Sequence, residues 1–307
     1  MTDLATARRQ RLMGIGLMCI AVACLTGIDV IAKYLNDHMD TIEVVWARYA
    51  SAFVLAFAVS NPLTHPGLLI TRRPWLQLAR AVLMVAGTML NVLALRYLQL
   101  DQTLSILFST PFLVAAMAGP LLGEWVGWRQ WVAISVGFAG VLLVIRPGFG
   151  GLHPAAFLSV ATACCYALYG IVTRLLARVD SNETQLFYGN CIGALILSSV
   201  VWLVWTTPQS LLIVALMIFT GAIGSVGHYL LIAAHRLAPP ALITPFMYTQ
   251  LVWGIALGYA VFDQLPNGWT LAGAAVVIGS GLYIFNRERK AHGAETVRAT
   301  GGAAEPH

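Results

Sequence analysis

Charged side chains are scarce in this sequence: they make up 10% of its 307 residues, whereas apolar residues make up 59%. Ordinary globular domains carry about 25% charged residues, which keep their surfaces in contact with water. A soluble domain of this length would lack the polar surface to cover itself, and a lipid bilayer removes that need. The 18 basic residues are spread over many short segments rather than gathered in a patch, which argues against a nucleic-acid partner.

Cysteine is also rare, and its spacing excludes two kinds of site. The five cysteines all lie inside apolar runs and form no C-x-x-C pair: Cys19, Cys24, Cys164, Cys165 and Cys191. This pattern predicts buried free thiols rather than a disulfide framework or a zinc site. The motifs H-E-x-x-H, G-x-S-x-G and the P-loop are missing too. We therefore expect no enzyme activity, no metal and no cofactor, with any transport driven by a gradient or by the solute itself.

Ten apolar runs come close to the length of about 20 residues that a membrane-spanning helix needs. They lie near residues 12–33, 42–60, 76–95, 103–122, 129–146, 155–174, 184–205, 211–233, 242–262 and 270–286. Because backbone polar groups cannot stay unpaired in hydrocarbon, these runs must be helices rather than strands of an open sheet. The first run follows three arginines as a signal peptide would, but it is long and lacks a convincing cleavage motif. The sequence thus predicts an all-α membrane protein with ten transmembrane helices.

The distribution of Lys and Arg predicts the orientation. With the N-terminus inside, most basic residues fall in inner segments, and only Lys33, Arg48, Arg96 and Arg146 fall in outer ones. By the positive-inside rule both termini are then cytoplasmic, in a multi-pass protein of the bacterial cell inner membrane. Residues 291–307 are small and polar, which predicts a disordered cytoplasmic tail.

The polar residues of the fourth and ninth runs recur with a shift of 139 residues. Ser105, Ser109 and Thr110 map onto Thr244, Tyr248 and Thr249, and Lys33 matches Arg174 at the front of each half. The sequence therefore predicts two five-helix repeats, residues 1–147 and 150–290. Because five is odd, the second repeat enters the membrane inverted, and inverted repeats with a site near the midplane are typical of secondary transporters.

Three stretches resemble the EamA-type drug/metabolite transporter family: "LTGIDVIAKYL", "VVWARYASAFVLA" and the segment from "ALRYLQLDQTLSILFSTPF" to "LLVIRP". The residues that carry the resemblance are Gly27, Lys33, Arg48, Pro111, Gly123, Glu124, Gly137 and Gly140. The resemblance implies a basket of ten helices that exports small metabolites. By length and general character the chain is most similar to bacterial aromatic and broad-range amino-acid exporters of the YddG type. The second half departs from the family pattern, with Gln250 in the place of Pro111 and Asp263 in the place of Glu124.

The recurring hydroxyls are the first candidates for a substrate cavity. Ser105 and Ser109 are four residues apart, as are Thr244 and Tyr248, so each pair shares a helix face. Hydroxyls in membrane helices often bond the preceding turn of their own backbone, which is the alternative. The predicted cavity set, including buried amide, imidazole and aromatic candidates, is Ser105, Ser109, Thr110, Thr244, Tyr248, Thr249, Asn91, His228, Tyr166, Tyr169 and Trp253.

Three charged residues lie near the outer ends of the first two runs. Intramembrane charges usually pair, and Asp29 can pair with Lys33 one turn away or with Arg48 across the helical hairpin. In the second case Arg48 could exchange its partner for a substrate carboxylate and act as a gate. Asp29, Glu43 and His228 are the candidates for proton coupling.

These observations predict a secondary transporter that exports small amphipathic metabolites by alternating access, with aromatic and neutral amino acids as the expected solutes. A carrier for a sugar, nucleoside or drug-like solute is the alternative, and a channel is a further one. The expected partners are a small-molecule substrate and the lipid bilayer, with no requirement for an oligomer.

Overall fold

The computed structural model describes residues 2–59, 66–123, 127–145, 153–176, 179–237 and 244–301, and within these ranges the regular structure is helical throughout. The helices are α1 (Thr2–Asn36), α2 (Thr41–Val59), η1 (Pro66–Leu69), α3 (Pro74–Leu95), α4 (Leu100–Leu107), α5 (Thr110–Leu122), α6 (Trp128–Ile145), α7 (Ala155–Leu176), α8 (Asn182–Ser198), η2 (Val201–Leu203), α9 (Leu211–Leu237), η3 (Thr244–Tyr248), α11 (Thr249–Phe262) and α12 (Gly268–Gly301). Each of the ten predicted runs falls on one of these helices or on two consecutive ones.

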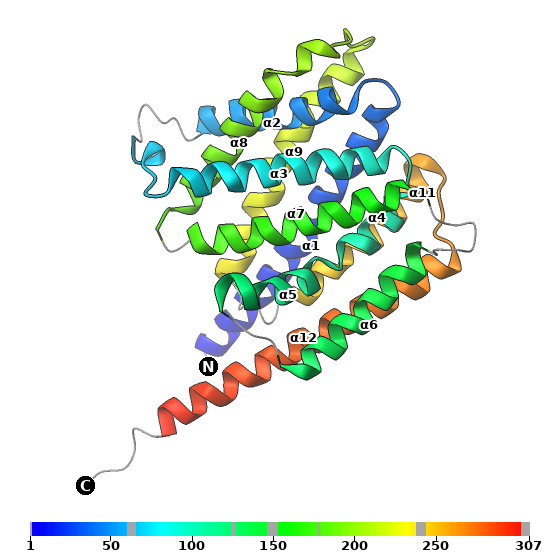
Figure 1. The fold of residues 1–307 in the computed structure, drawn as a ribbon. Helices are drawn as coiled ribbons and strands as arrows, with labels where there is room; N and C mark the ends of the chain where they lie inside the picture. Colours follow the sequence, from blue (N-terminus) through cyan, green and yellow to red (C-terminus); the bar gives the residue numbers. More distant parts are fainter. Residues whose placement is uncertain are drawn as a thin grey trace.

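Among the described residues, six helices are long and apolar enough to cross a membrane: α1, α2, α3, α7, α8 (with η2) and α9. Shorter apolar helices cover Trp131–Ile145, Phe246–Phe262 and Gly268–Tyr283. The chain is therefore a multi-pass membrane protein. The start of α1 and the end of α12 lie at the same end of the bundle (Figure 1), as an even number of crossings requires.

The fourth predicted run is broken, with α4 ending at Leu107 and α5 beginning at Thr110. Pro111 has no backbone N–H, so it cannot donate to the carbonyl of Leu107 one turn earlier. The Thr110 hydroxyl donates to that carbonyl instead, at 2.6 Å. In the second half η3 passes into α11, and the Thr249 hydroxyl donates to the Phe246 carbonyl at 2.6 Å. Both polar positions therefore stabilise interruptions of a helix.

The helices pack in pairs that the repeat relation exchanges. α1 packs against α9, and α3 packs against α7. Since α7 and α9 are the counterparts of α1 and α3 in the second repeat, exchanging the two repeats turns one contact into the other. α2 packs on α8, α4 on α11 and α6 on α12, so in these pairs an element meets its own counterpart. In Figure 1, α6 and α12 run side by side along one edge of the bundle. This pattern of contacts is expected for two inverted repeats.

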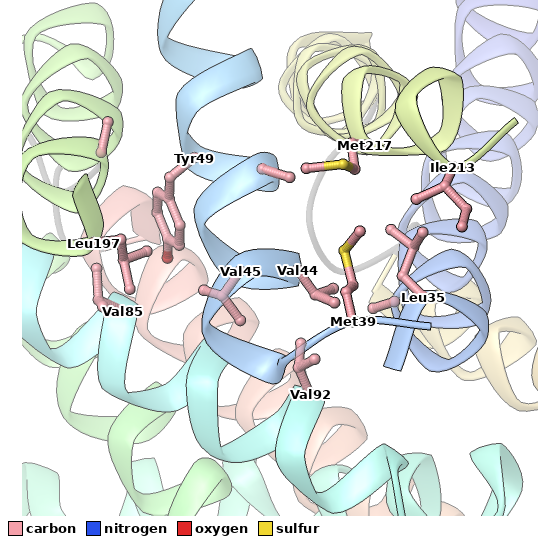
Figure 2. Close-up of a cluster of buried hydrophobic side chains, with 13 residues drawn as sticks. Leu35, Met39, Val44, Val45, Tyr49, Val85, Val92, Leu197, Ile213 and Met217 are labelled. Atoms are coloured by element: carbon pink, nitrogen blue, oxygen red, sulfur yellow. The ribbon is translucent and has the colours of Figure 1, made fainter. Parts of the chain in front are cut away.

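The largest apolar core cluster lies between α1, α2, α3, α8 and α9. Leu35, Val44, Val45 and Leu197 are at most 2% exposed there, and Figure 2 shows the Tyr49 ring at one side of this cluster. Burial of a side chain of this size contributes about 1.5–3 kcal/mol in a protein interior that excludes water. The cluster therefore fixes α2 and α3, which carry much of the site described below.

The end of the chain differs from the sequence prediction. α12 continues to Gly301, so residues 291–301 are helical rather than without structure. Ala, Glu, Lys and Arg are strong helix formers, and they extend the apolar helix into a polar one. Residues 302–307 lie outside the described part, as does Glu124.

Candidate substrate-binding site

A stripe of buried polar side chains runs along one face of α3. Gln77, Arg80, Thr88 and Asn91 recur at the spacing of a helix face, and each is at most 3% exposed. From Arg80 to Asn91 the stripe extends for about 16 Å at 1.5 Å per residue. Arg80 contacts α7 and α8 of the second repeat, whereas Thr88 and Asn91 contact α2 and α1 of the first. We call these four residues the α3 polar stripe.

Asp29 of α1 accepts a hydrogen bond from Asn91 at one end of the stripe, with 3.0 Å between Asn91 Nδ2 and Asp29 Oδ1. The Oδ1 atom of Asn91 is buried and has no hydrogen-bond partner. Arg48 of α2 lies within electrostatic range of the Asp29 carboxylate. This end of the stripe thus combines a carboxylate, a guanidinium and an unsatisfied amide oxygen.

Neither ion pair expected from the sequence is formed among the described residues. Lys33 donates instead to the carbonyls of Leu95 and Leu98, at 2.8 and 2.5 Å. Those carbonyls lie where α3 ends, and helix ends leave carbonyls without an intrahelical donor. Asp29 therefore bonds Asn91, and Arg48 interacts with the Asp29 carboxylate only at longer range. The assignment of Arg48 as a gate stays a prediction.

Aromatic and imidazole side chains border the middle of the stripe. The hydroxyls of Tyr49 and Thr88 are 3.1 Å apart. Tyr166 of α7 packs over Gly87, where an added Cβ would stand 2.7 Å from its ring. His228 of α9 lies within electrostatic range of Arg48 and Arg80. The structure therefore brings four predicted residues (Asn91, Asp29, Tyr166 and His228) to one region.

Arg80 lies near the other end of the stripe, where three neutral acceptors surround its guanidinium. Its Nε donates to Thr173 Oγ1 at 2.9 Å, its Nη1 to the Gln185 carbonyl at 2.6 Å and its Nη2 to the Tyr169 hydroxyl at 2.6 Å. The guanidinium also lies 4.7 Å from the centre of the Tyr169 ring, close enough for a cation–π interaction.

The hydroxyls of the fourth run have local partners. Ser105 is fully buried and donates to the Asp101 carbonyl at 2.7 Å, while Ser109 is 8% exposed. Like Thr110 and Thr249, Ser105 bonds the preceding turn, which was the alternative expectation. Their role in lining a cavity stays a prediction.

The remaining candidates of the ninth run lie away from the α3 polar stripe. Tyr248 makes an edge contact with Phe108, with 5.2 Å between ring centres, and its hydroxyl lies against Gly281 of α12. Trp253 is 39% exposed on α11, which packs on α1 and α4. The side chain of Thr244 lies outside the described part.

Two carboxylates connect loops at opposite ends of the bundle (Figure 1). Near the start of α8, Asp180 accepts from the Thr71 hydroxyl at 2.5 Å, the Gln77 amide at 2.8 Å and the Arg72 backbone N–H at 3.2 Å. We call these residues the Asp180 cluster. Burial opposes ionisation, but these bonds, with the nearby Arg72 charge, hold the pKa of Asp180 below its usual value.

Glu43 forms the counterpart at the other end, in the first turn of α2. It accepts from both the backbone N–H and the hydroxyl of Thr206, and from the Asp40 backbone N–H at 3.3 Å. We call Glu43, Asp40 and Thr206 the Glu43 cluster. Each cluster combines one carboxylate with a threonine hydroxyl and a backbone N–H. Glu43, a sequence candidate for proton coupling, thus holds two loops together.

Sequence reasoning missed Arg80, Tyr49, Thr88 and Gln185. Arg80 was counted among the basic residues of an inner segment because it lies only two turns from the start of α3. The signal that could have found it is the helical spacing of Gln77, Arg80, Thr88 and Asn91 within an otherwise apolar run.

Comparisons with known proteins agree with the architecture. The model of the EamA-like transporter family matches residues 12–146 and 153–286. The chain is 28% identical to the S-adenosylmethionine uptake transporter of Rickettsia conorii, over 93% of this chain and 96% of that one. It is 26% identical to the riboflavin transporter of Rhizobium johnstonii, over 94% of this chain and 96% of that one.

A crystal structure aligns with a TM-score of 0.59 and 15% identity over 89% of this chain and 95% of that one, a likeness of fold alone. The named relatives are S-adenosylmethionine and riboflavin transporters rather than the YddG-type amino-acid exporters expected from the sequence. With both halves matched by the family model, the chain belongs to the EamA-like transporter family.

Proposed function

We propose that this chain is a carrier that takes up S-adenosylmethionine or a closely similar metabolite. Relatives named for S-adenosylmethionine uptake align over almost the whole chain, in four rickettsial species. The names of these relatives favour a solute other than an amino acid, and they favour uptake over export. Two inverted repeats supply the architecture for alternating access.

The observation that carries the proposal is the partly buried Asp29–Asn91 pair beside Arg48 and two tyrosines. S-adenosylmethionine has a fixed positive charge at sulfur, which no proton transfer can remove. A carboxylate held at the repeat interface offsets that charge inside the membrane, and aromatic faces such as those of Tyr49 and Tyr166 attract cations. When no solute is bound, the positive charge of Arg48 stabilises the Asp29 carboxylate at long range.

Riboflavin is the second candidate, because relatives of that name align over 94% and 86% of the chain. Its ring system carries no fixed positive charge and would use the tyrosine faces without needing Asp29. The two candidates therefore differ in their dependence on one residue.

Counterflow in proteoliposomes tests the proposal. Vesicles loaded with unlabelled S-adenosylmethionine should accumulate the labelled compound with saturation, which separates a carrier from a channel. Riboflavin, tryptophan and adenosine serve as further solutes. Asp29→Asn should lower S-adenosylmethionine exchange by at least about tenfold, as expected for the loss of a charged contact.

Asp263→Asn is a matched control, because Asp263 lies in the exposed turn after α11. Saturable exchange of tryptophan without exchange of either S-adenosylmethionine or riboflavin would refute the proposed solute class. Exchange of riboflavin alone, unchanged in Asp29→Asn, would establish the second candidate instead.

A further inference from the structure

Arg80 is a buried cation without a buried anion. It is 3% exposed, and no Asp or Glu of the described ranges forms an ion pair with it. An isolated buried charge is costly, and proteins usually pair it with an opposite charge. Its three hydrogen bonds use three of the five N–H donors of a guanidinium, so two donors remain.

A second, independent observation points to the same place. Gln185 is 2% exposed, and both its side-chain nitrogen and its side-chain oxygen have no hydrogen-bond partner. Its backbone carbonyl is one of the three acceptors around Arg80. Buried amides that lack a protein partner are rare, and a bound polar group can satisfy them.

The next turn of α8 brings a glycine beside the guanidinium. Gly189 follows Gln185 by four residues, on the same helix face. A Cβ added at Gly189 would stand 3.4 Å from Arg80 Nη1. A methyl group here would therefore contact the guanidinium nitrogen directly.

We propose that Arg80 and Gln185 form a carboxylate-binding subsite for the transported solute. This inference rests on the proposed function: the carboxylate of the aminoacyl tail would bind at Arg80. Arg80 lies on the α3 polar stripe, and Asn91 of the same stripe bonds the Asp29 carboxylate of α1. Arg80 thereby selects solutes that carry an anionic tail.

The test compares two ligands on the full-length protein in lipid nanodiscs: S-adenosylmethionine and its decarboxylated analogue. The wild type should bind the carboxylated compound at least about tenfold more tightly, as a charged hydrogen bond provides. Arg80→Gln should abolish this preference while leaving affinity for the analogue unchanged. Arg73→Gln, which removes an exposed charge at the same end of α3, should keep the preference.

Two further variants guard against a folding defect in Arg80→Gln. Gln185→Met removes the amide at similar volume, and Gly189→Ala places a methyl group beside Nη1. Both should reduce the preference for the carboxylate by about threefold or more, on the scale of one hydrogen bond. An Arg80→Gln or Gly189→Ala protein that folds and retains the full preference overturns the subsite.

If the wild type binds neither adenosyl compound, the proposed function is refuted. A second experiment then tests the carboxylate-binding subsite by itself. Acetate and phosphate are then compared with chloride at equal ionic strength in thermal unfolding. Acetate should raise the unfolding midpoint of the wild type and not that of Arg80→Gln. Equal midpoints for the two proteins in acetate, or stabilisation by phosphate alone, would overturn the carboxylate assignment.

Discussion

Thr110 and Thr249 make the same hydrogen bond at corresponding positions of the two repeats: each hydroxyl donates at 2.6 Å to the carbonyl three residues earlier. Only the first repeat has a proline in the next position, Pro111, and Gln250 stands at its counterpart. The backbone N–H of Gln250 is therefore available where that of Pro111 is missing. The shared hydroxyl is thus more important in the first repeat than in the second.

Thr110→Val should accordingly lower the free energy of unfolding by about 1–3 kcal/mol, because the Leu107 carbonyl would lose its donor. Thr249→Val should cost less. Thr162→Val is the control, since the Thr162 hydroxyl bonds a carbonyl inside the regular helix α7. Thermal or denaturant unfolding in detergent measures all three, and equal effects of Thr110→Val and Thr162→Val would contradict the role of Pro111.

Lys33→Met should destabilise the protein by about 1–3 kcal/mol, because two carbonyls at the end of α3 would lose a charged donor. Arg96→Met removes an exposed charge at the same helix end and should have little effect. The unfolding midpoint of each variant checks this. A Lys33→Met protein as stable as Arg96→Met would show that these carbonyls do not need Lys33.

Asp180→Asn tests the Asp180 cluster through its pH dependence. The folded-state pKa of Asp180 lies below the usual 3.8. The charged carboxylate therefore contributes stability that is complete well above pH 3.8 and is lost as the pH falls through the lower folded value. The wild type should be more stable than Asp180→Asn at pH 7, and the difference should shrink below about pH 4.

Glu183→Gln, which changes an exposed carboxylate of the first turn of α8, serves as the control for that comparison. Unfolding midpoints between pH 3 and pH 7 give the measurement. A difference between wild type and Asp180→Asn that grows in acid would reverse the predicted sign.

Gly140→Ala should weaken the packing of α6 on α12. A Cβ at Gly140 would stand 2.9 Å from the Gly273 carbonyl oxygen, and backbone atoms cannot move aside cheaply. Overpacking of this kind typically costs about 1–3 kcal/mol. Gly279→Ala in α12 is the matched control, because its Cβ would meet no atom within 4 Å. Equal unfolding midpoints for the two variants would argue against a close helix crossing.

The helices could be predicted from the sequence because a bilayer imposes a length and forbids unpaired backbone groups. The partners of polar side chains were harder to predict, since they depend on residues far along the chain. Lys33 bonds carbonyls more than 60 positions away, which no local pattern reveals. Arg80 illustrates a second difficulty. As a basic residue near the start of an apolar run, it is expected in an inner loop, yet it is buried. Its helical spacing with Thr88 and Asn91 is the sequence feature that indicates an interior position.

The Asp180 and Glu43 clusters are both formed in the same structure, one at each end of the bundle. Opening either end breaks the same kinds of bond, so the two openings carry similar energetic costs. In the alternating-access cycle proposed above, two open states of similar free energy would let a solute with a small differential affinity shift the balance between them. A substitution in one cluster alone should therefore bias the carrier toward one side of the membrane and slow its cycle.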